Sequence, residues 1–117
     1  MFRALLLFYL ALPFAATPQS ARLVEVRIDV IADSSNHLEA VLQVAPDTNG
    51  RELLERLFKM EYVDFTKRFV TGIAGFKASP KEKKFWLLEV DGVAAEVGIA
   101  EIVIKQKTHL RWRMSSY

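Results

Sequence analysis

The alternation of apolar and polar residues from position 23 to 31 constrains the fold of this chain more than any other feature. Successive side chains of an extended strand point to opposite faces, so the pattern predicts one apolar and one charged face. The apolar face would carry Val24, Val26, Ile28 and Val30, and the charged face Glu25, Arg27 and Asp29. A second alternating run at 38–44 follows a turn-rich connector at 32–37, and this short spacing favours a β-hairpin with a core on one side.

A helix is predicted directly after the hairpin. Residues 46–49 read Pro-Asp-Thr-Asn, and we expect Asp47 or Thr48 to accept hydrogen bonds from the first free backbone amides of the helix. Apolar residues then recur at three- and four-residue spacing, which indicates one apolar stripe. The stripe comprises Leu53, Leu54, Leu57 and Phe58, and we expect it to continue to Met60 or Glu61.

The second half of the sequence predicts further strands. Residues 85–90 are apolar on both faces, which is typical of an interior strand, and the Asp91-Gly92 pair that follows is a hairpin-turn signal. Residues 76–84 are expected to form a polar loop. The other strands are expected around 68–73, at 99–104 and at 109–114, the last with Leu110, Trp112 and Met114 facing the core.

This order of elements predicts an α+β fold. A hairpin, one helix and a further set of strands suit a β-grasp (ubiquitin-like) architecture, in which a mixed sheet packs on a single helix. One helix covers only one face of such a sheet. The opposite face must therefore be partly polar, or must meet a ligand or a partner.

The N-terminus has the order of a secretory signal peptide. Arg3 precedes an apolar run at 4–12, Pro13 ends that run, and small or polar residues follow up to Ala21. The apolar run is shorter than the roughly 20 residues that a membrane-spanning helix needs. We therefore expect a signal peptide at 1–21, one domain at 22–117, a secreted or periplasmic location, and no membrane span after cleavage.

Charge and cysteine content exclude several classes of function. The chain has no cysteine, which excludes a disulfide framework, a thiol nucleophile and a cysteine-based zinc site. Apart from Arg3, which lies in the predicted signal peptide, the chain has 15 basic and 14 acidic residues and thus a net charge of +1. A net charge this close to neutral argues against a nucleic-acid partner recognised through its phosphates.

Three sequence blocks in the second half carry a family resemblance. They are FVTGIAG at 69–75, KFWLL at 84–88 and VGIAE at 97–101, the last followed by THLRW at 108–112. In sequence and spacing, these blocks resemble the C-terminal domain of the transcobalamin, intrinsic-factor and haptocorrin carriers. The resemblance extends over roughly 23–114 and is strongest from position 69 onward.

This resemblance implies binding of cobalamin or another corrinoid. In the family carriers the ligand lies between a large all-helical barrel and this small domain, and the loop before the Gly-Ile-Ala element approaches the corrin. The matching residues here are Ala95, Glu96, Val97 and Gly98. Since the sequence has no counterpart of the barrel, a partner protein or a second copy would have to complete the site, unless the affinity is weak.

Two aromatic residues outside this loop are also candidate ligand-binding residues. Phe76 follows a glycine turn and precedes a polar loop, so its ring is expected to be either exposed for binding or packed in the core. Trp86, like Trp112, is expected either to pack in the core among its aliphatic neighbours or to stack on a ligand.

The sequence contains no recognisable catalytic constellation, and we expect a protein that is not an enzyme and holds no metal. Ser34, Ser35 and His37 are explained by a polar turn. His37 and His109 are expected to be solvated surface residues, with ligation of a metal or of the cobalt of cobalamin as the alternative. The alternative to small-molecule binding is a protein-interaction or adhesion module that uses the open sheet face or edge.

Overall fold

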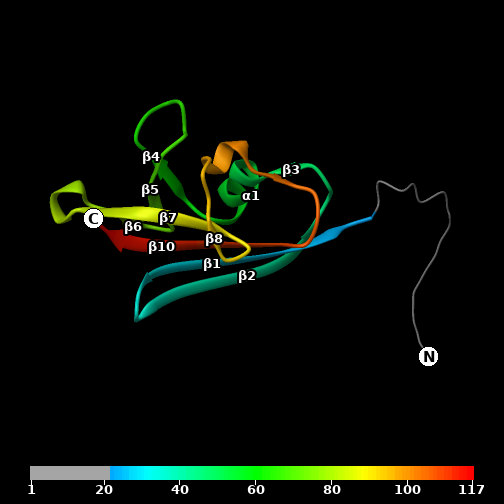
Figure 1. Cartoon of the computed structure of the whole chain (residues 1–117), viewed down its shortest axis with the longest axis horizontal. Helices are drawn as coiled ribbons and strands as arrows, with labels where there is room; N and C mark the ends of the chain where they lie inside the picture. The colour runs from blue at the N-terminus through cyan, green and yellow to red at the C-terminus, as the bar shows by residue number, and fades with distance from the viewer. Residues whose placement is uncertain (1–21) are drawn as a thin grey trace.

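The main sheet of the computed structural model, which describes residues 22–117, is built from five strands (Figure 1). They are β1 (Val24–Asp33), β2 (Asn36–Val44), β7 (Lys84–Val90), β8 (Val93–Ala94) and β10 (Thr108–Ser116). Their order across the sheet is β2-β1-β10-β7-β8. β1 pairs in parallel with β10, whereas the other neighbours are antiparallel. This mixed sheet, with one α-helix among the described residues packed on it, is the predicted β-grasp fold.

The helix α1 (Gly50–Leu57) begins later and ends earlier than predicted. Its N-cap is Asn49, whose side-chain oxygen accepts a hydrogen bond from the backbone N–H of Glu52 at 3.1 Å. Asp47 and Thr48 were therefore wrong as caps, because Thr48 and Asn49 first form the short strand β3 (Thr48–Asn49), which pairs with β9 (Val103–Ile104).

The core lies between α1 and the face of the sheet that the alternation marked as apolar. Its fully buried members include Ile28 of β1, Leu110 of β10 and Leu54 of α1. Burial of such aliphatic side chains contributes about 1.5–3 kcal/mol each. The predicted division of β1 into two faces is confirmed for the apolar residues, whereas Asp29 on the charged face is also buried.

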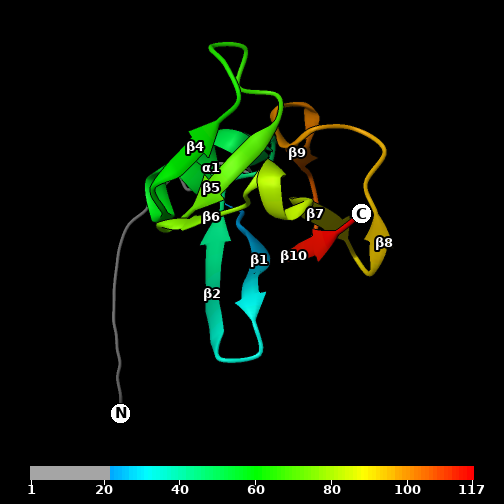
Figure 2. The same cartoon turned by 90° about the vertical axis from the view of Figure 1, so that its left-hand side faces the viewer.

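A second, three-stranded sheet stands beside the main one. It is formed by β4 (Met60–Tyr62), β5 (Val70–Ile73) and β6 (Phe76–Lys77), with β5 in the middle. The predicted continuation of the helix to Met60 or Glu61 was wrong, because these residues pair with Ile73 and Gly72 of β5. The loop between β4 and β5 projects away from the rest of the chain (Figure 2).

The two remaining segments differ in part from the prediction. The expected polar loop at 76–84 contains β6 and the 3₁₀ helix η2 (Pro80–Glu82). The expected strand at 99–104 is instead the 3₁₀ helix η3 (Ile99–Glu101) followed by β9. Here the backbone carbonyls of Ala100 and Ile102 accept hydrogen bonds from the Asn49 side chain and the Gly50 N–H at the start of α1.

The signal peptide predicted at 1–21 lies outside the described residues. Within residues 22–117, no helix combines the length and the apolar character needed to cross a membrane.

Candidate functional site

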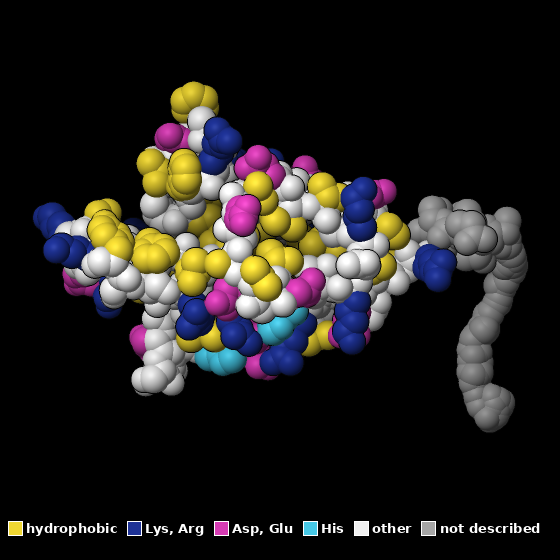
Figure 3. Space-filling view, in the orientation of Figure 1, with side chains coloured by type: hydrophobic (Ala, Val, Ile, Leu, Met, Phe, Trp, Pro, Cys, Tyr) yellow, Lys and Arg dark blue, Asp and Glu magenta, His cyan; other side chains and the backbone are white. Residues whose placement is uncertain are grey.

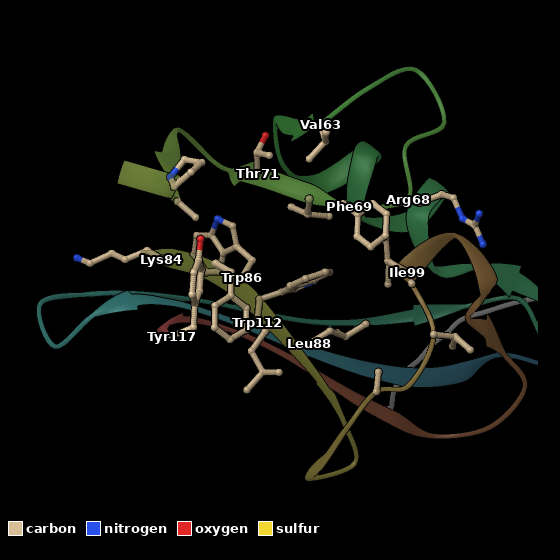
Figure 4. Close-up of a pocket in the computed structure, with 18 of the residues that line it drawn as sticks. Val63, Arg68, Phe69, Thr71, Lys84, Trp86, Leu88, Ile99, Trp112 and Tyr117 are labelled. Atoms are coloured by element: carbon tan, nitrogen blue, oxygen red, sulfur yellow. The ribbon is translucent and has the colours of Figure 1, made fainter. Parts of the chain in front are cut away.

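A cleft of about 540 Å³ opens between the main sheet and the β4–β5 segment (Figure 4). Its floor is formed by the core-side residues of the sheet, Trp86 and Leu88 of β7 and Trp112 of β10. Strand periodicity explains this floor, because Trp86 and Leu88 are two positions apart on β7 and Trp112 lies directly opposite Leu88. The cleft is thus a local extension of the core to the surface, with two indole rings at its base.

The two tryptophans differ in their polar contacts. Trp86 Nε1 donates a hydrogen bond to the backbone carbonyl of Phe76 at 3.3 Å. Trp112 is only 4% exposed, and its Nε1 has no acceptor within the described part of the chain. A buried donor without a partner costs about 1–3 kcal/mol, so the indole N–H of Trp112 lowers the stability of the domain.

The opposite wall comes from the β4–β5 segment. Val63 and Phe69 line this wall and the Phe69 ring faces the sheet, whereas the side chains of Arg68 and Thr71 point away from it (Figure 4). A backbone hydrogen bond from Val63 N–H to the Phe69 carbonyl at 3.0 Å closes the base of the loop. The wall is therefore mainly apolar, and Phe69 remains 67% exposed.

A cluster on α1 ties this loop to the body of the domain. The Tyr62 hydroxyl donates to Glu55 at 2.6 Å, and Lys67 Nζ lies 3.8 Å from the same carboxylate. Burial and the hydrogen bond to Glu55 raise the pKa of Tyr62 well above its usual value, because both disfavour the phenolate. Tyr62 therefore remains a neutral donor at any physiological pH.

The end of the cleft is formed by the chain between β8 and η3. Ala95 is fixed by a backbone hydrogen bond from its N–H to the Leu88 carbonyl at 2.9 Å. Gly98 packs against the backbone of Arg68, since a Cβ built on Gly98 would lie 3.0 Å from the Arg68 carbonyl oxygen. Gly98 therefore contacts another loop of the same domain, and its predicted approach to a ligand stays a prediction.

The structure brings five of the six predicted ligand-binding residues to this one cleft. They are Trp86, Ala95, Glu96, Val97 and Gly98. Phe76 does not line the cleft; its half-buried side chain packs against the core. The sequence analysis did not identify Phe69 and Val63 as site residues, because they reach the cleft only through the placement of the β4–β5 loop over the sheet. Ligand binding by all these residues stays a prediction.

A separate polar cluster occupies the opposite face of the main sheet. Asp29, 2% exposed, receives contacts from His37 Nε2 at 3.0 Å and from His109 Nε2 at 2.5 Å. Figure 3 shows histidine side chains among basic and acidic ones on this side of the molecule. The sequence interpretation treated the two histidines as separate solvated residues; it missed that the polar faces of β2, β1 and β10 meet at Asp29.

The surroundings of Asp29 keep it ionised. Burial acts to raise the pKa of its carboxyl group, but the hydrogen bonds of His37 and His109 and the positive charge of Arg27 outweigh burial and hold the pKa below its usual range. A carboxylate in this state is suited to accept hydrogen bonds or to bind a cation.

Several solved structures are similar to this fold, and haptocorrin is among them. Haptocorrin in complex with Cbi superposes with a TM-score of 0.67 at 18% identity, over 88% of this chain and 27% of that chain. A protein from Ruminococcus gnavus ATCC 29149, described as a "putative metal binding protein", superposes with a TM-score of 0.66 at 13% identity, over 80% of this chain and 98% of that chain. The chain thus spans about a quarter of the haptocorrin chain. No curated protein matches the sequence.

At these identities the structural likeness establishes the fold, which is the one the resemblance implied. The sequence itself matches a family model over residues 50–116, from the start of α1 to the end of β10. The matched region is more than half of the chain and includes every residue of the cleft except Tyr117. The chain belongs to the family described as "Domain of unknown function (DUF4430)".

Proposed function

We propose that this protein is a non-catalytic binding module that acts outside the cytoplasm and holds a corrinoid in the cleft above Trp86 and Trp112. The observation that carries the proposal is the cleft itself, a concave and mainly apolar site of about 540 Å³ with two indole rings in its floor. Sites of this size with few polar groups are typical of small-molecule binding. The fold shared with haptocorrin, described in complex with Cbi, supports a corrinoid as the ligand class.

The shape and chemistry of the lining suit a flat ligand with apolar edges. Trp86, Trp112 and Phe69 offer aromatic surface, and aromatic rings favour stacked or edge-to-face contacts with extended planar groups. Among the residues that line the cleft, Glu96 offers a polar side chain.

A partner or a second copy of the chain would cover the ligand from outside. Val63, Phe69 and Val97 line the cleft and are nevertheless largely exposed, so a bound ligand would meet solvent on the side away from the sheet. Contact with a second surface would remove this apolar area from water and strengthen binding.

The test is a titration of the purified protein with hydroxocobalamin and cyanocobalamin. The chain has two tryptophans, and both line the cleft, so their fluorescence reports on this site directly. We expect saturable quenching with a matching change in the visible spectrum of the corrinoid. Unchanged fluorescence and an unchanged spectrum at saturating ligand would refute the corrinoid proposal.

A matched pair of variants shows whether binding occurs in this cleft. Val97→Lys places a long charged side chain at the cleft, and Val93→Lys places the same side chain outside it. Both valines lie in the 93–98 segment, with exposed fractions of 48% and 69% respectively, so neither change disturbs the core. We expect Val97→Lys to weaken binding at least tenfold and Val93→Lys to leave it unchanged.

The second candidate function is protein interaction through the edge of the main sheet. β2 is a nine-residue edge strand with Val41 exposed, and an uncovered edge can pair with an added strand. Concentration-dependent oligomers that disappear in a Val41→Pro variant, without any affinity for corrinoids, would favour this function. A monomer at all concentrations would contradict self-pairing through β2.

A further inference from the structure

The register of the β1–β2 hairpin places three potential metal ligands on the outer face of the sheet. Asp29 of β1 lies directly opposite Glu39 of β2, and His37 lies two residues before Glu39, so all three side chains share one face. His37 Nε2 is 3.0 Å from Asp29 Oδ1 and 3.7 Å from Glu39 Oε2. One ligand atom from each residue lies within 4.8 Å of the other two.

These separations fit the coordination sphere of a small divalent cation. Zinc binds imidazole nitrogen and carboxylate oxygen at about 2.0–2.2 Å, which puts neighbouring ligand atoms of a tetrahedral site roughly 3.3–3.6 Å apart. The distances from His37 Nε2 to Asp29 Oδ1 and to Glu39 Oε2 lie on either side of this range. Only small side-chain adjustments are therefore needed to place a cation between the three atoms.

The surrounding residues support the same assignment. His109 Nε2 contacts the second oxygen, Oδ2, of Asp29 and so orients the carboxylate while leaving Oδ1 directed at His37. Hydrogen-bonded carboxylates of this kind are common among metal ligands, because outer contacts fix the ligand geometry. Asp29 lies on β1, which has a paired strand on each side. The side chains of His37 and Glu39 are about half-exposed and are therefore accessible to an ion from solvent.

Arg27 supplies the positive charge that a metal ion would replace. Like charges opposite each other on neighbouring strands are destabilising, and the Asp29–Glu39 pair is such a case. Arg27 bridges the two carboxylates, with Nε 3.4 Å from Asp29 and Nη2 3.1 Å from Glu39. Its side chain is half-exposed, so it can swing into solvent when a cation takes its place.

We propose that Asp29, His37 and Glu39 bind one divalent first-row transition metal ion, with zinc as the reference ion and His109 as the residue that positions Asp29. One nitrogen and two oxygens suit zinc, cobalt and nickel, and the outer side of the site leaves room for water or a further ligand. The site lies on the face of the sheet opposite the cleft. It is therefore independent of the small-molecule site.

The test is a titration of the purified protein with Zn²⁺ by calorimetry and with Co²⁺ by visible absorption. We expect the unaltered protein to bind one equivalent of metal. His37→Ala and Glu39→Gln should each lower the affinity at least tenfold. Arg27→Gln should bind more tightly, because it removes the competing positive charge. Glu25→Gln is the matched control, because Glu25 lies on the same face of β1 but outside the cluster. It should bind as the unaltered protein does.

Two results would overturn the proposal. The first is no saturable binding of Zn²⁺ or Co²⁺ by either the unaltered protein or Arg27→Gln. The second is binding that persists at full affinity in both His37→Ala and Glu39→Gln while circular dichroism shows all variants to be folded. Because the side chains of His37 and Glu39 are about half-exposed on the edge strand β2, and Arg27 is half-exposed on β1, we expect the variants to fold.

Discussion

The backbone of Gly98 packs directly on the carbonyl group of Arg68, thirty residues earlier in the chain. A Cβ at Gly98 would lie 3.0 Å from the Arg68 carbonyl oxygen, closer than most such contacts. The φ angle of Gly98 is −76°, which any residue adopts, so the glycine is required by this contact and not by its own conformation. The contact joins the two loops that form one end of the cleft.

Gly98→Ala is therefore expected to separate these loops. Overpacking of this kind costs about 1–3 kcal/mol, and we expect the lower end of that range because both segments are loops. Chemical denaturation measures the loss of stability, and corrinoid titration should show weaker binding. Unchanged stability together with unchanged binding would mean that the loops adjust freely and that their contact does not shape the cleft.

The two tryptophans of the cleft floor should respond differently to replacement by phenylalanine. Trp86→Phe removes the donor to the Phe76 carbonyl, whereas Trp112→Phe removes a buried N–H without a partner in the described chain. Both changes delete the same atoms, so the difference between them isolates the hydrogen bond. We expect Trp86→Phe to be more destabilising by roughly 1 kcal/mol in urea denaturation. Equal losses of unfolding free energy in the two variants would contradict the finding that Trp86 Nε1 is hydrogen-bonded and Trp112 Nε1 is not.

The sequence was sufficient to predict the parts of the fold that depend on local pattern. Alternation located β1, β2 and β10, and the two-sided apolar run located β7 as an interior strand next to the Asp91-Gly92 turn. These signals are local, because successive side chains of a strand point to opposite faces and the sequence of each strand therefore shows which face is buried. The cleft residues 95–98 were found through the family resemblance, and spacing alone did not indicate them.

The remaining features depend on contacts between distant residues. Met60 continues the helical apolar stripe, yet it forms β4 because it pairs with Ile73. The Asp29–His109 contact joins residues 80 positions apart, through a parallel pairing that no local pattern specifies. Phe69 lines the cleft because the β4–β5 loop lies over the main sheet, and this arrangement depends on the tertiary fold. Tertiary pairing thus overrides local propensity at these positions.

Tyr62 should make the stability of the domain fall at alkaline pH. Its pKa is raised in the folded state, so the folded protein holds the phenolic proton more tightly than the unfolded chain does. The resulting stabilisation is fully present below the unfolded pKa of about 10 and is lost as the pH rises above it. Urea denaturation at pH 9 and pH 11 should show this loss. In Tyr62→Phe the loss should be smaller, and an identical loss would contradict the assignment.

Phe65 and Phe69 lie on the same projecting loop but should differ in function. Phe65 is 93% exposed and does not line the cleft, whereas Phe69 is 67% exposed and faces the cleft floor. Neither ring is buried in the core, so Phe65→Ser and Phe69→Ser should each change the unfolding free energy by less than about 0.5 kcal/mol.

Phe69→Ser removes an aromatic contact from the cleft wall and is expected to weaken corrinoid binding about tenfold, while Phe65→Ser leaves it unchanged. Fluorescence titration of the two variants side by side measures this difference, since both retain Trp86 and Trp112. If Phe65→Ser weakened binding as much as Phe69→Ser, the loop tip would have to close over the ligand. If neither variant had an effect, the ligand would bind without contact to the β4–β5 wall, and the cleft as described would not be the binding site.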